Sequence, residues 1–242
     1  MLVEICLPAY NEESILEKNI TILLNFVKKQ NWFFNIQITV VLNNCSDNSL
    51  EIIKKISVKH PGVVYYNLKK EGKGNAVKHA WEKSQADIFA YMDVDIAVSL
   101  ENLDSLLSSI YSEKNHLVWG SRLLPLSKTK RGVIRTISSK LYNLLSQAVL
   151  HHKFTDLQCG FKAIDNKIRE DILPLIEDDN WFFDTELIIY SKGKKYRLKE
   201  IPVKWEESRY QKRSSKIKPL KDAYIFIKKT YTLAKKIKSP NK

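Results

Sequence analysis

Two carboxylates separated by one residue follow an apolar run near the middle of the chain. Asp93 and Asp95 come directly after residues 88–92, which read as a buried strand. Mg²⁺ and Mn²⁺ take oxygen ligands, and proteins usually hold them with one or two carboxylates while substrate phosphate oxygens complete the shell. The triplet therefore predicts a site for Mg²⁺ or Mn²⁺ held against a diphosphate. Acidic residues after a strand also begin solvated turns or cap helices, so the surrounding sequence must decide.

Strand-like and helix-like segments alternate through the first part of the chain. Apolar runs predict strands at residues 3–7, 36–42, 63–68 and 88–92. Periodic apolar positions and turn residues predict intervening helices at residues 16–29, around 52–56 and at 75–84. Strands that alternate with helices in short units predict an α/β fold with a mostly parallel sheet and helices on both faces.

The turns that follow parallel strands open on one edge of the sheet, where ligands bind. Four such turns are expected there, at residues 8–12, 43–47, 72–74 and 93–95. Gly72-Lys73-Gly74 at a helix start offers backbone N–H groups and a cation to a phosphate, although it also suits a plain turn and lacks the length of a P-loop. The first turn lacks the G-x-G-x-x-G pattern, so NAD or FAD is not expected.

Length and composition are those of a folded α/β protein. The chain has 242 residues, of which 44% are apolar, enough for one domain with or without a short appendage. Neither a run of about 18 uncharged apolar residues nor a signal-peptide pattern occurs, which predicts a soluble or peripheral protein. Cys6, Cys45 and Cys159 lack the spacing of a zinc site or a disulfide scaffold, which favours a reduced, cytoplasmic setting.

Positive charge is concentrated at the C-terminal end. Twelve Lys or Arg and one acid lie between Arg209 and Lys242, so this segment carries +11 of the net charge of +13. Apolar residues at helical spacing, interleaved with lysines, predict a basic amphipathic helix there. Such a helix either lies on anionic lipid or docks on its own domain with a solvated lysine face. Nucleic-acid binding is not expected, because the segment contains no recognisable reader motif.

Six short motifs recur in a fixed order along the chain. They read PAYNEE at 8–13, GKGNA at 72–76, DVD at 93–95, GSR at 120–122, DLQCGFK at 156–162 and WFFDTE at 181–186. In this series the chain resembles family 2 glycosyltransferases of GT-A fold, and within them the dolichyl-phosphate mannose and glucose synthases. The resemblance covers roughly residues 3–218 and implies a catalytic domain at residues 1–208, followed at 209–242 by a basic loop and an amphipathic helix.

The resemblance also implies roles for individual residues. The base and ribose of a nucleotide sugar would lie against Pro8, Ala9, Tyr10 and Glu12, and the metal would bind Asp93 and Asp95. An acceptor phosphate would be held by Arg122, Arg135 and Ser139. In the family a basic motif closes over the diphosphate. Here it follows a strand expected at residues 201–205, and the matching residue is Lys216, with Arg213 second. We also assign to the substrate-binding set Asp47, Lys73, Gln158, Asp184 and Glu186.

Two departures from the family pattern bear on the donor. Family members commonly carry a double Asp after the second strand, of which only Asp47 remains here, so the identity of the base stays open. The mannose synthases tend to carry Gln where this chain has Ala97, and the WFFD motif that ends at Asp184 is more similar to the glucosyl branch. These differences favour UDP-glucose over GDP-mannose.

The expected mechanism depends on the acceptor. A lipid monophosphate is already anionic at neutral pH, so it needs alignment and no general base. The metal and Lys216 would offset charge on the leaving nucleoside diphosphate, and attack from the opposite face would invert the anomeric carbon. If the acceptor were a sugar hydroxyl, Asp156 would be the expected base, with Asp184 or Glu186 as substitutes. Each of these acids could equally brace the fold.

A second apolar helical face runs through residues 131–150. It could be simple core, whereas the resemblance implies an interfacial helix beside a membrane. Together with the basic tail, it predicts a cytoplasmic enzyme peripheral to an anionic membrane surface or bound to a membrane-embedded partner, making a polyprenyl-phosphate hexose. The alternatives are a cytoplasmic glycosyltransferase with a hydroxyl acceptor on a glycan or glycolipid, and a non-catalytic relative that binds nucleotide sugars.

Overall fold

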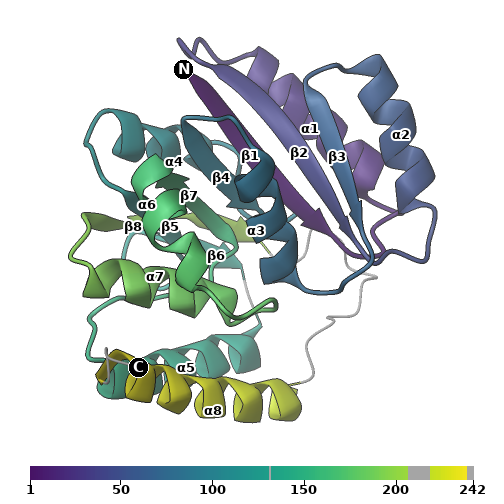
Figure 1. Cartoon of the computed structure of the whole chain (residues 1–242). Helices are drawn as coiled ribbons and strands as arrows, with labels where there is room; N and C mark the ends of the chain where they lie inside the picture. Colours follow the sequence, from purple (N-terminus) through teal and green to yellow (C-terminus); the bar gives the residue numbers. More distant parts are fainter. Residues whose placement is uncertain (131, 207–218, 239–242) are drawn as a thin grey trace.

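A seven-stranded sheet runs through the centre of the computed structural model (Figure 1), in the order β3-β2-β1-β4-β7-β5-β8. Its strands are β1 (Leu2–Ala9), β2 (Asn35–Asn43), β3 (Val63–Leu68), β4 (Ile88–Met92), β5 (Leu117–Ser121), β7 (Phe161–Asp165) and β8 (Leu198–Pro202). The structure describes residues 1–130, 132–206 and 219–238, without the side chains of 134, 135 and 219–222. The predicted domain boundary after residue 208 lies outside the described residues.

Strand β7 runs against the direction of its neighbours. It pairs antiparallel with β4 and with β5, whereas the other described pairings within this sheet are parallel. Because of this reversal, the start of β7 lies beside the end of β4, with Phe161 opposite Met92. The turn that precedes β7 therefore reaches the same edge of the sheet as the turns that follow the parallel strands.

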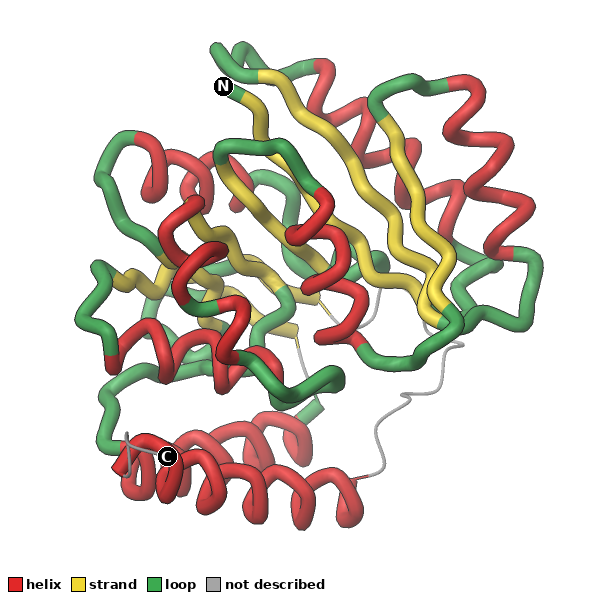
Figure 2. The backbone as a smooth tube through the Cα atoms, in the orientation of Figure 1, coloured by secondary structure: helices red, strands yellow, loops and turns green. Residues whose placement is uncertain are grey.

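Helices cover both faces of the sheet, as predicted (Figure 2). One face packs against α1 (Leu16–Lys28), α2 (Ser49–Lys59) and α4 (Asn102–Tyr111). The other packs against α3 (Lys73–Lys83), α6 (Asn166–Asp171) and α7 (Phe183–Gly193). Every residue of β4 is buried, as expected for a strand covered on both faces.

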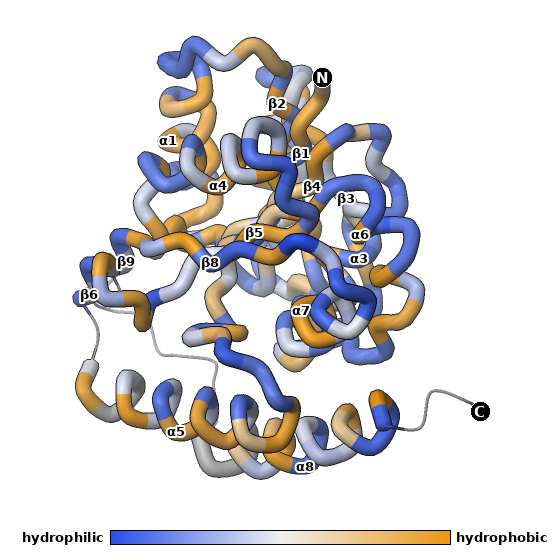
Figure 3. Tube along the Cα trace, turned by 90° about the vertical axis from the view of Figure 1, so that its left-hand side faces the viewer, coloured by the Kyte–Doolittle hydropathy of each residue, from blue (hydrophilic) through white to orange (hydrophobic). Residues whose placement is uncertain are grey.

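Two long helices, α5 (Val133–Leu150) and α8 (Pro219–Lys238), lie side by side below the sheet (Figures 1 and 3). The predicted C-terminal amphipathic helix is confirmed, and it docks on the protein: Thr230 and Leu233 are buried, and the Phe226 ring meets the Tyr142 ring edge-on. The outward sides of both helices expose large apolar residues. None of the helices within the described ranges is long and apolar enough to cross a bilayer.

Two predicted elements differ in their bounds. Helix α3 begins at Lys73, two residues earlier than expected, so Lys73 sits in its first turn. The strand expected at residues 201–205 is divided into β8 and β9 (Lys204–Glu206). Pro202 ends β8, because proline has no N–H for a sheet ladder, and β9 then pairs with the short strand β6 (Lys128–Lys130) in a separate two-stranded sheet.

Candidate active site

The turns after β1 and β2 are tied together by side-chain hydrogen bonds. Asn11, in the left-handed region with φ 52°, accepts the Ser46 N–H at 2.8 Å. Asp47 accepts the N–H of Glu13 at 2.9 Å and that of Ser49 at 3.1 Å. Partial burial opposes the charge of Asp47, but the hydrogen bonds from Ser49 and Glu13 prevail and lower the pKa of its carboxyl. Asp47 thus braces this turn, and its contact with a donor base stays a prediction.

The residues assigned to the base and ribose differ in exposure. Tyr10 is exposed, Pro8 is half-buried and Ala9 is buried at the end of β1. Glu12 is buried, its N–H donates to Ser49 Oγ at 3.1 Å, and its carbonyl accepts the N–H of Leu16 at 2.9 Å where α1 begins. Tyr10 is therefore the member of this set best placed to meet a ligand, and the role of all four stays a prediction.

Lys73 reaches from the third turn to the fourth. Its Nζ lies 2.7 Å from Asp93 Oδ1, 5.1 Å from the centre of the Tyr91 ring and 5.0 Å from that of Trp181. Burial of Lys73 disfavours its charge, but Asp93 and Asp184 outweigh this effect and raise its pKa. The Lys73 ammonium group therefore stays protonated beside Asp93, a predicted metal ligand.

Two backbone N–H groups where α3 begins are already engaged within the protein. Gly74 donates its N–H to the carbonyl of Asn180 at 3.2 Å, and Asn75 donates to the carbonyl of Asp179 at 2.9 Å. The loop before α7 therefore occupies these amides. A diphosphate at this edge would meet the Lys73 ammonium and not these two donors.

The two predicted metal ligands lie on one tight turn. The Ile96 N–H donates to the carbonyl of Asp93 at 3.0 Å, and the Ala97 N–H donates to Asp95 Oδ1 at 3.1 Å. The Asp93 N–H donates to the carbonyl of Gly160 at 3.1 Å, which joins β4 to the turn before β7. A Cβ atom on Gly160 would lie 2.1 Å from Asp93 Oδ2, so only glycine leaves room for this carboxylate.

Asp93 and Asp95 fit a hard divalent cation by the chemistry of their donors. Both offer carboxylate oxygens, and the Asp93 side chain is 41% exposed at the open edge of the sheet. Mg²⁺ is usually bound by one or two carboxylates together with substrate phosphates, which matches a pair of this kind. Among the residues that the structure describes, no group of three or more His, Cys, Asp or Glu lies close enough to hold a metal.

Arg122 and Asp156 form a buried two-point ion pair. Arg122 Nε lies 2.7 Å from Asp156 Oδ2 and Nη2 lies 2.9 Å from Oδ1, while the Arg122 N–H donates to Oδ2 at 3.1 Å. Burial opposes ionisation of Asp156, but Arg122 prevails and lowers its pKa. Asp156 therefore fixes Arg122 and is a weak proton acceptor.

The other residues assigned to the acceptor and the diphosphate are only partly among those that the structure describes. Ser139 is half-buried on α5. Arg135 belongs to the same helix, but its side chain is outside the described set. Lys216, and Arg213 with it, fall in the 207–218 segment, outside the described residues. A shared acceptor site built from Arg122, Arg135 and Ser139 stays a prediction.

Asp184 is enclosed in a polar network beneath the site. Its Oδ1 lies 2.9 Å from Lys162 Nζ and accepts the hydroxyl of Tyr91. Lys162 is fully buried and also donates to the carbonyls of Leu157 at 3.1 Å and Cys159 at 2.6 Å. Sequence reasoning gave Lys162 and Tyr91 no role. The sequence did contain a signal for Lys162, because this lysine ends the DLQCGFK motif and lies inside an otherwise apolar segment.

Glu186 and Gln158 hold the elements around α7. Glu186 Oε2 accepts the N–H groups of Glu177 at 2.9 Å and Asp178 at 2.8 Å, and burial raises the pKa of Glu186. Gln158 donates its side-chain amide to Thr185 Oγ1 at 2.8 Å. Both side chains therefore brace the protein, and their contact with substrate stays a prediction.

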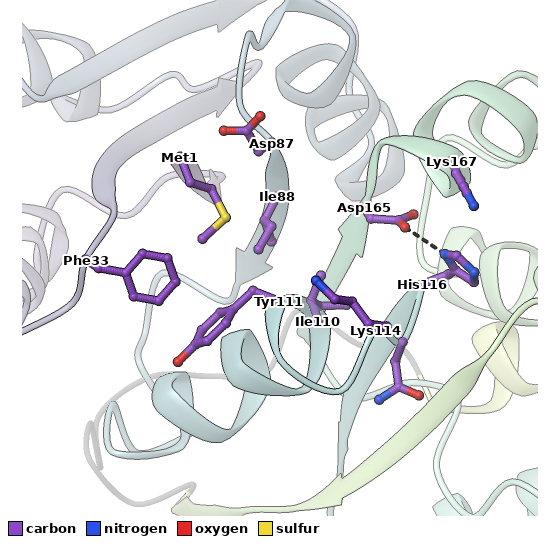
Figure 4. Close-up of a pocket in the computed structure, with 11 residues that line it drawn as sticks. Met1, Phe33, Asp87, Ile88, Ile110, Tyr111, Lys114, His116, Asp165 and Lys167 are labelled. Atoms are coloured by element: carbon purple, nitrogen blue, oxygen red, sulfur yellow. Dashed lines mark hydrogen bonds and ion pairs between the residues drawn. The ribbon is translucent and has the colours of Figure 1, made fainter.

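A hollow of about 520 Å³ lies at the opposite edge of the sheet (Figure 4). Met1, Phe33, Ile88 and Tyr111 form its apolar side, and His116 lies there with its Nδ1 2.7 Å from Asp165 Oδ2. Met1, Ile88 and His116 lie at the amino ends of β1, β4 and β5, Tyr111 ends α4, and Asp165 ends the reversed strand β7. No residue assigned to the active site lines this hollow.

Residues 4–173 match the family model described as glycosyl transferase family 2. The chain belongs to this family. The match contains the Asp93–Asp95 turn, Lys73 and the Arg122–Asp156 pair, whereas Trp181, Asp184 and Glu186 follow it in the sequence.

Family 2 relatives with curated names resemble most of this chain. Glycosyltransferase AglD from Haloferax volcanii is 29% identical over 84% of this chain and 33% of its own length. Dolichyl-phosphate beta-glucosyltransferase ALG5C from Trichomonas vaginalis is 28% identical over 83% of this chain and 62% of its own length. The dolichyl-phosphate beta-glucosyltransferase of Saccharomyces cerevisiae is 23% identical over 96% of this chain and 76% of its own length. The chain thus spans less than two thirds of the first two relatives.

Solved structures confirm the predicted fold. Glucosyl-3-phosphoglycerate synthase from Mycobacterium tuberculosis, in complex with Mn²⁺, UDP and phosphoglyceric acid, superposes with a TM-score of 0.66 at 15% identity. The alignment covers 97% of this chain and 78% of that structure. The family 2 chain described here therefore has the GT-A architecture expected from its motifs.

Proposed function

We propose that this protein is an inverting, metal-dependent glycosyltransferase that moves a hexose from a nucleotide sugar to a polyprenyl phosphate. The observation that carries the proposal is the Asp93–Asp95 turn with the Lys73 cation 2.7 Å from Asp93, at the edge where α/β sheets bind ligands. Membership of family 2 supports the reaction class, and relatives named dolichyl-phosphate beta-glucosyltransferase support the acceptor class.

Asp93 and Asp95 would hold Mg²⁺ or Mn²⁺, which when bound offsets negative charge on the leaving diphosphate. Lys73 adds a cation beside that position, and the Tyr91 and Trp181 rings lie 5.1 Å and 5.0 Å from its Nζ. A phosphate acceptor brings its own negative charge and needs no proton acceptor. This requirement agrees with Asp156, whose carboxylate is committed to Arg122 and whose pKa is lowered.

UDP-glucose is the donor that we favour over GDP-mannose. The WFFD motif ending at Asp184 is more similar to the glucosyl branch, and Ala97 departs from the Gln that mannose synthases tend to carry. Several relatives are named as glucosyltransferases. The Mn²⁺ and UDP in the superposed synthase support a uridine nucleotide and this class of metal.

The membrane surface is the proposed location of the reaction, on its cytoplasmic side. Leu141 and Leu144 on α5 and Tyr224 and Tyr231 on α8 are exposed, and exposed lysines accompany them. Apolar side chains bordered by lysines suit an anionic lipid surface or a membrane-embedded partner. A prenyl chain could then stay in lipid while its phosphate reaches the site.

A transfer assay tests the proposal. UDP-glucose, GDP-mannose and UDP-N-acetylglucosamine are offered with a polyprenyl phosphate in detergent, with Mn²⁺ or with EDTA. We expect transfer from UDP-glucose only with metal, and Asp93→Asn to lower the rate by at least about 100-fold. Glu82→Gln, an exposed acid on α3, is the matched control and should retain the rate. Transfer that persists in EDTA or in Asp93→Asn would refute the mechanism.

The hydroxyl-acceptor alternative finds little support among the three carboxylates predicted as its base. Asp156 is paired with Arg122, Asp184 with Lys162, and Glu186 accepts two backbone N–H groups. An acceptor panel that includes free sugars and glycolipids separates the two reactions. A non-catalytic relative would show neither transfer nor metal-dependent hydrolysis of any nucleotide sugar.

A further inference from the structure

Helix α8 is joined to the loop that precedes α7, here called the 177–182 loop. Lys229 pairs with Asp178, and Lys236 pairs with Glu177. The Phe226 ring of α8 meets the Phe182 ring edge-on at 5.7 Å. The Asp178 carboxylate is buried, so Lys229 supplies the cation that compensates it, whereas Lys236 and Glu177 form an exposed pair.

Asp178 in turn determines the shape of the 177–182 loop. Its Oδ1 accepts the N–H of Asn180 at 2.7 Å and that of Phe182 at 3.2 Å. Its own N–H donates to Glu186 on α7 at 2.8 Å. One side chain therefore organises the loop from within, and the charge of that side chain is balanced from α8.

The 177–182 loop then holds the turn that carries Lys73. The carbonyl of Asn180 accepts the Gly74 N–H at 3.2 Å, and the carbonyl of Asp179 accepts the Asn75 N–H at 2.9 Å. The Trp181 ring lies 5.0 Å from Lys73 Nζ. A Cβ atom on Gly74 would lie 2.8 Å from the carbonyl oxygen of Asp178, so loop and turn are in close backbone contact.

We infer that Lys229 is a positioning residue for the donor site, acting through Asp178 and the 177–182 loop on Lys73. The inference rests on the proposed function in one respect, that Lys73 serves the donor diphosphate. The helix that exposes Tyr224 and Tyr231 also holds, from its other side, the loop behind Lys73. Docking of α8 on the catalytic domain thereby sets the geometry in which Lys73 meets Asp93.

Two substitutions on α8, one at Lys229 and one at Lys228 as its control, test this coupling. Lys229→Met removes the ammonium and keeps most of the stem, and Lys228→Met removes the same charge from an exposed position on the same helix. Amide hydrogen exchange at Gly74 and Asn75 should accelerate about tenfold in Lys229→Met, because their acceptors lie on the released loop. The affinity for UDP in the presence of Mn²⁺, measured by calorimetry, should fall about fivefold. Lys228→Met should change neither value, and Lys229→Arg should restore both.

Asp178→Asn provides the second variant, since it retains the Oδ1 acceptor and loses the charge that Lys229 balances. It should reproduce the effects of Lys229→Met, and the double variant should be no worse than either single one. Wild-type exchange at Gly74 and Asn75 in both single variants would overturn the inference. Acceleration spread equally over β1 and β4 would also overturn it, since the change would then be global. A wild-type protein that binds no UDP would refute the proposed donor, while the exchange measurement would still decide the coupling.

Discussion

Gly160 shows how one missing side chain shapes the site. Its Cα faces the Asp93 carboxylate so closely that a Cβ atom would lie 2.1 Å from Oδ2 and 2.5 Å from Oδ1. Gly160→Ala must therefore displace Asp93. We expect the Mn²⁺ concentration for half-maximal transfer to rise about tenfold or more, because the carboxylate leaves its position on the turn. A metal titration of the transfer rate measures this shift.

Gly193→Ala is the matched control for that experiment. Gly193 ends α7, and a Cβ atom there would meet nothing within 4 Å. The control should keep the metal dependence of the parent protein. Equal metal dependence in Gly160→Ala would show that Asp93 does not bind the activating ion from this position.

Glu4 gives the protein a pH-dependent stability. Burial raises the pKa of Glu4 from 4.5 to about 7, against a hydrogen bond from Thr39 that lowers it. Between pH 4.5 and 7 the Glu4 carboxyl keeps its proton in the folded protein but has lost it in the unfolded chain. The free energy of unfolding therefore falls as the pH rises from 4.5 through 7. We expect the free energy of unfolding to fall by about 2 to 3 kcal/mol between pH 5 and 8 from this group. Urea unfolding across this range, compared with Glu4→Gln, should show a flatter profile in the variant.

Residue types and spacing predicted which residues meet at the sheet edge, but they did not predict the buried ion pairs of the site. Asp93, Asp95 and Lys73 were predicted to meet because each follows a strand at the same sheet edge, and the structure brings Lys73 to Asp93. The pairing of Asp156 with Arg122 and of Asp184 with Lys162 could not be read from the sequence. Which of several acids takes which cation depends on side-chain packing across elements distant in the chain.

At the scale of elements, a buried ion pair joins β7 to α7. Lys162→Met leaves the Asp184 carboxylate without its cation in a buried position, so we expect a loss of about 3 to 5 kcal/mol in the free energy of unfolding. Asp184→Asn, added to Lys162→Met, should recover part of the loss. Denaturant unfolding of the parent protein and of the two variants gives these values.

Lys54→Met is the control, because it removes a lysine charge from an exposed ion pair: Lys54 and its partner Glu51 are both exposed on α2. Its unfolding midpoint should match that of the parent protein. A midpoint in Lys162→Met that also matches the parent would show that the buried pair contributes little to stability.

Element types were more predictable than element directions and partners. Alternating apolar segments indicated the strands and helices of the first half, and all of these are present. Apolar patterning does not encode strand direction, so the reversed insertion of β7 between β4 and β5 had no sequence signal. The amphipathic pattern likewise predicted α8, but the choice between lipid and protein for its buried side required the contacts with Phe182 and Asp178.

For the whole molecule, the outward side of α5 and α8 defines the proposed membrane face. We expect Leu141→Glu combined with Leu144→Glu to lower binding to anionic vesicles at least about tenfold, since both side chains are exposed on α5. Val58→Glu, at an even more exposed apolar position on α2, is the control and should bind like the parent protein. Sedimentation with vesicles at low and high salt measures both effects, and undiminished binding by the α5 variant would refute this orientation.

The reversed strand has a consequence for how the protein matures on the ribosome. A nascent chain that has emerged through residue 95 already contains both acids of the DVD turn, but Gly160, against which Asp93 rests, is synthesised 67 residues after Asp93. Closing such a distant contact is slow compared with local helix formation. The proposed metal affinity should accordingly appear late in biogenesis, after strands β1, β2 and β3 have had time to pair.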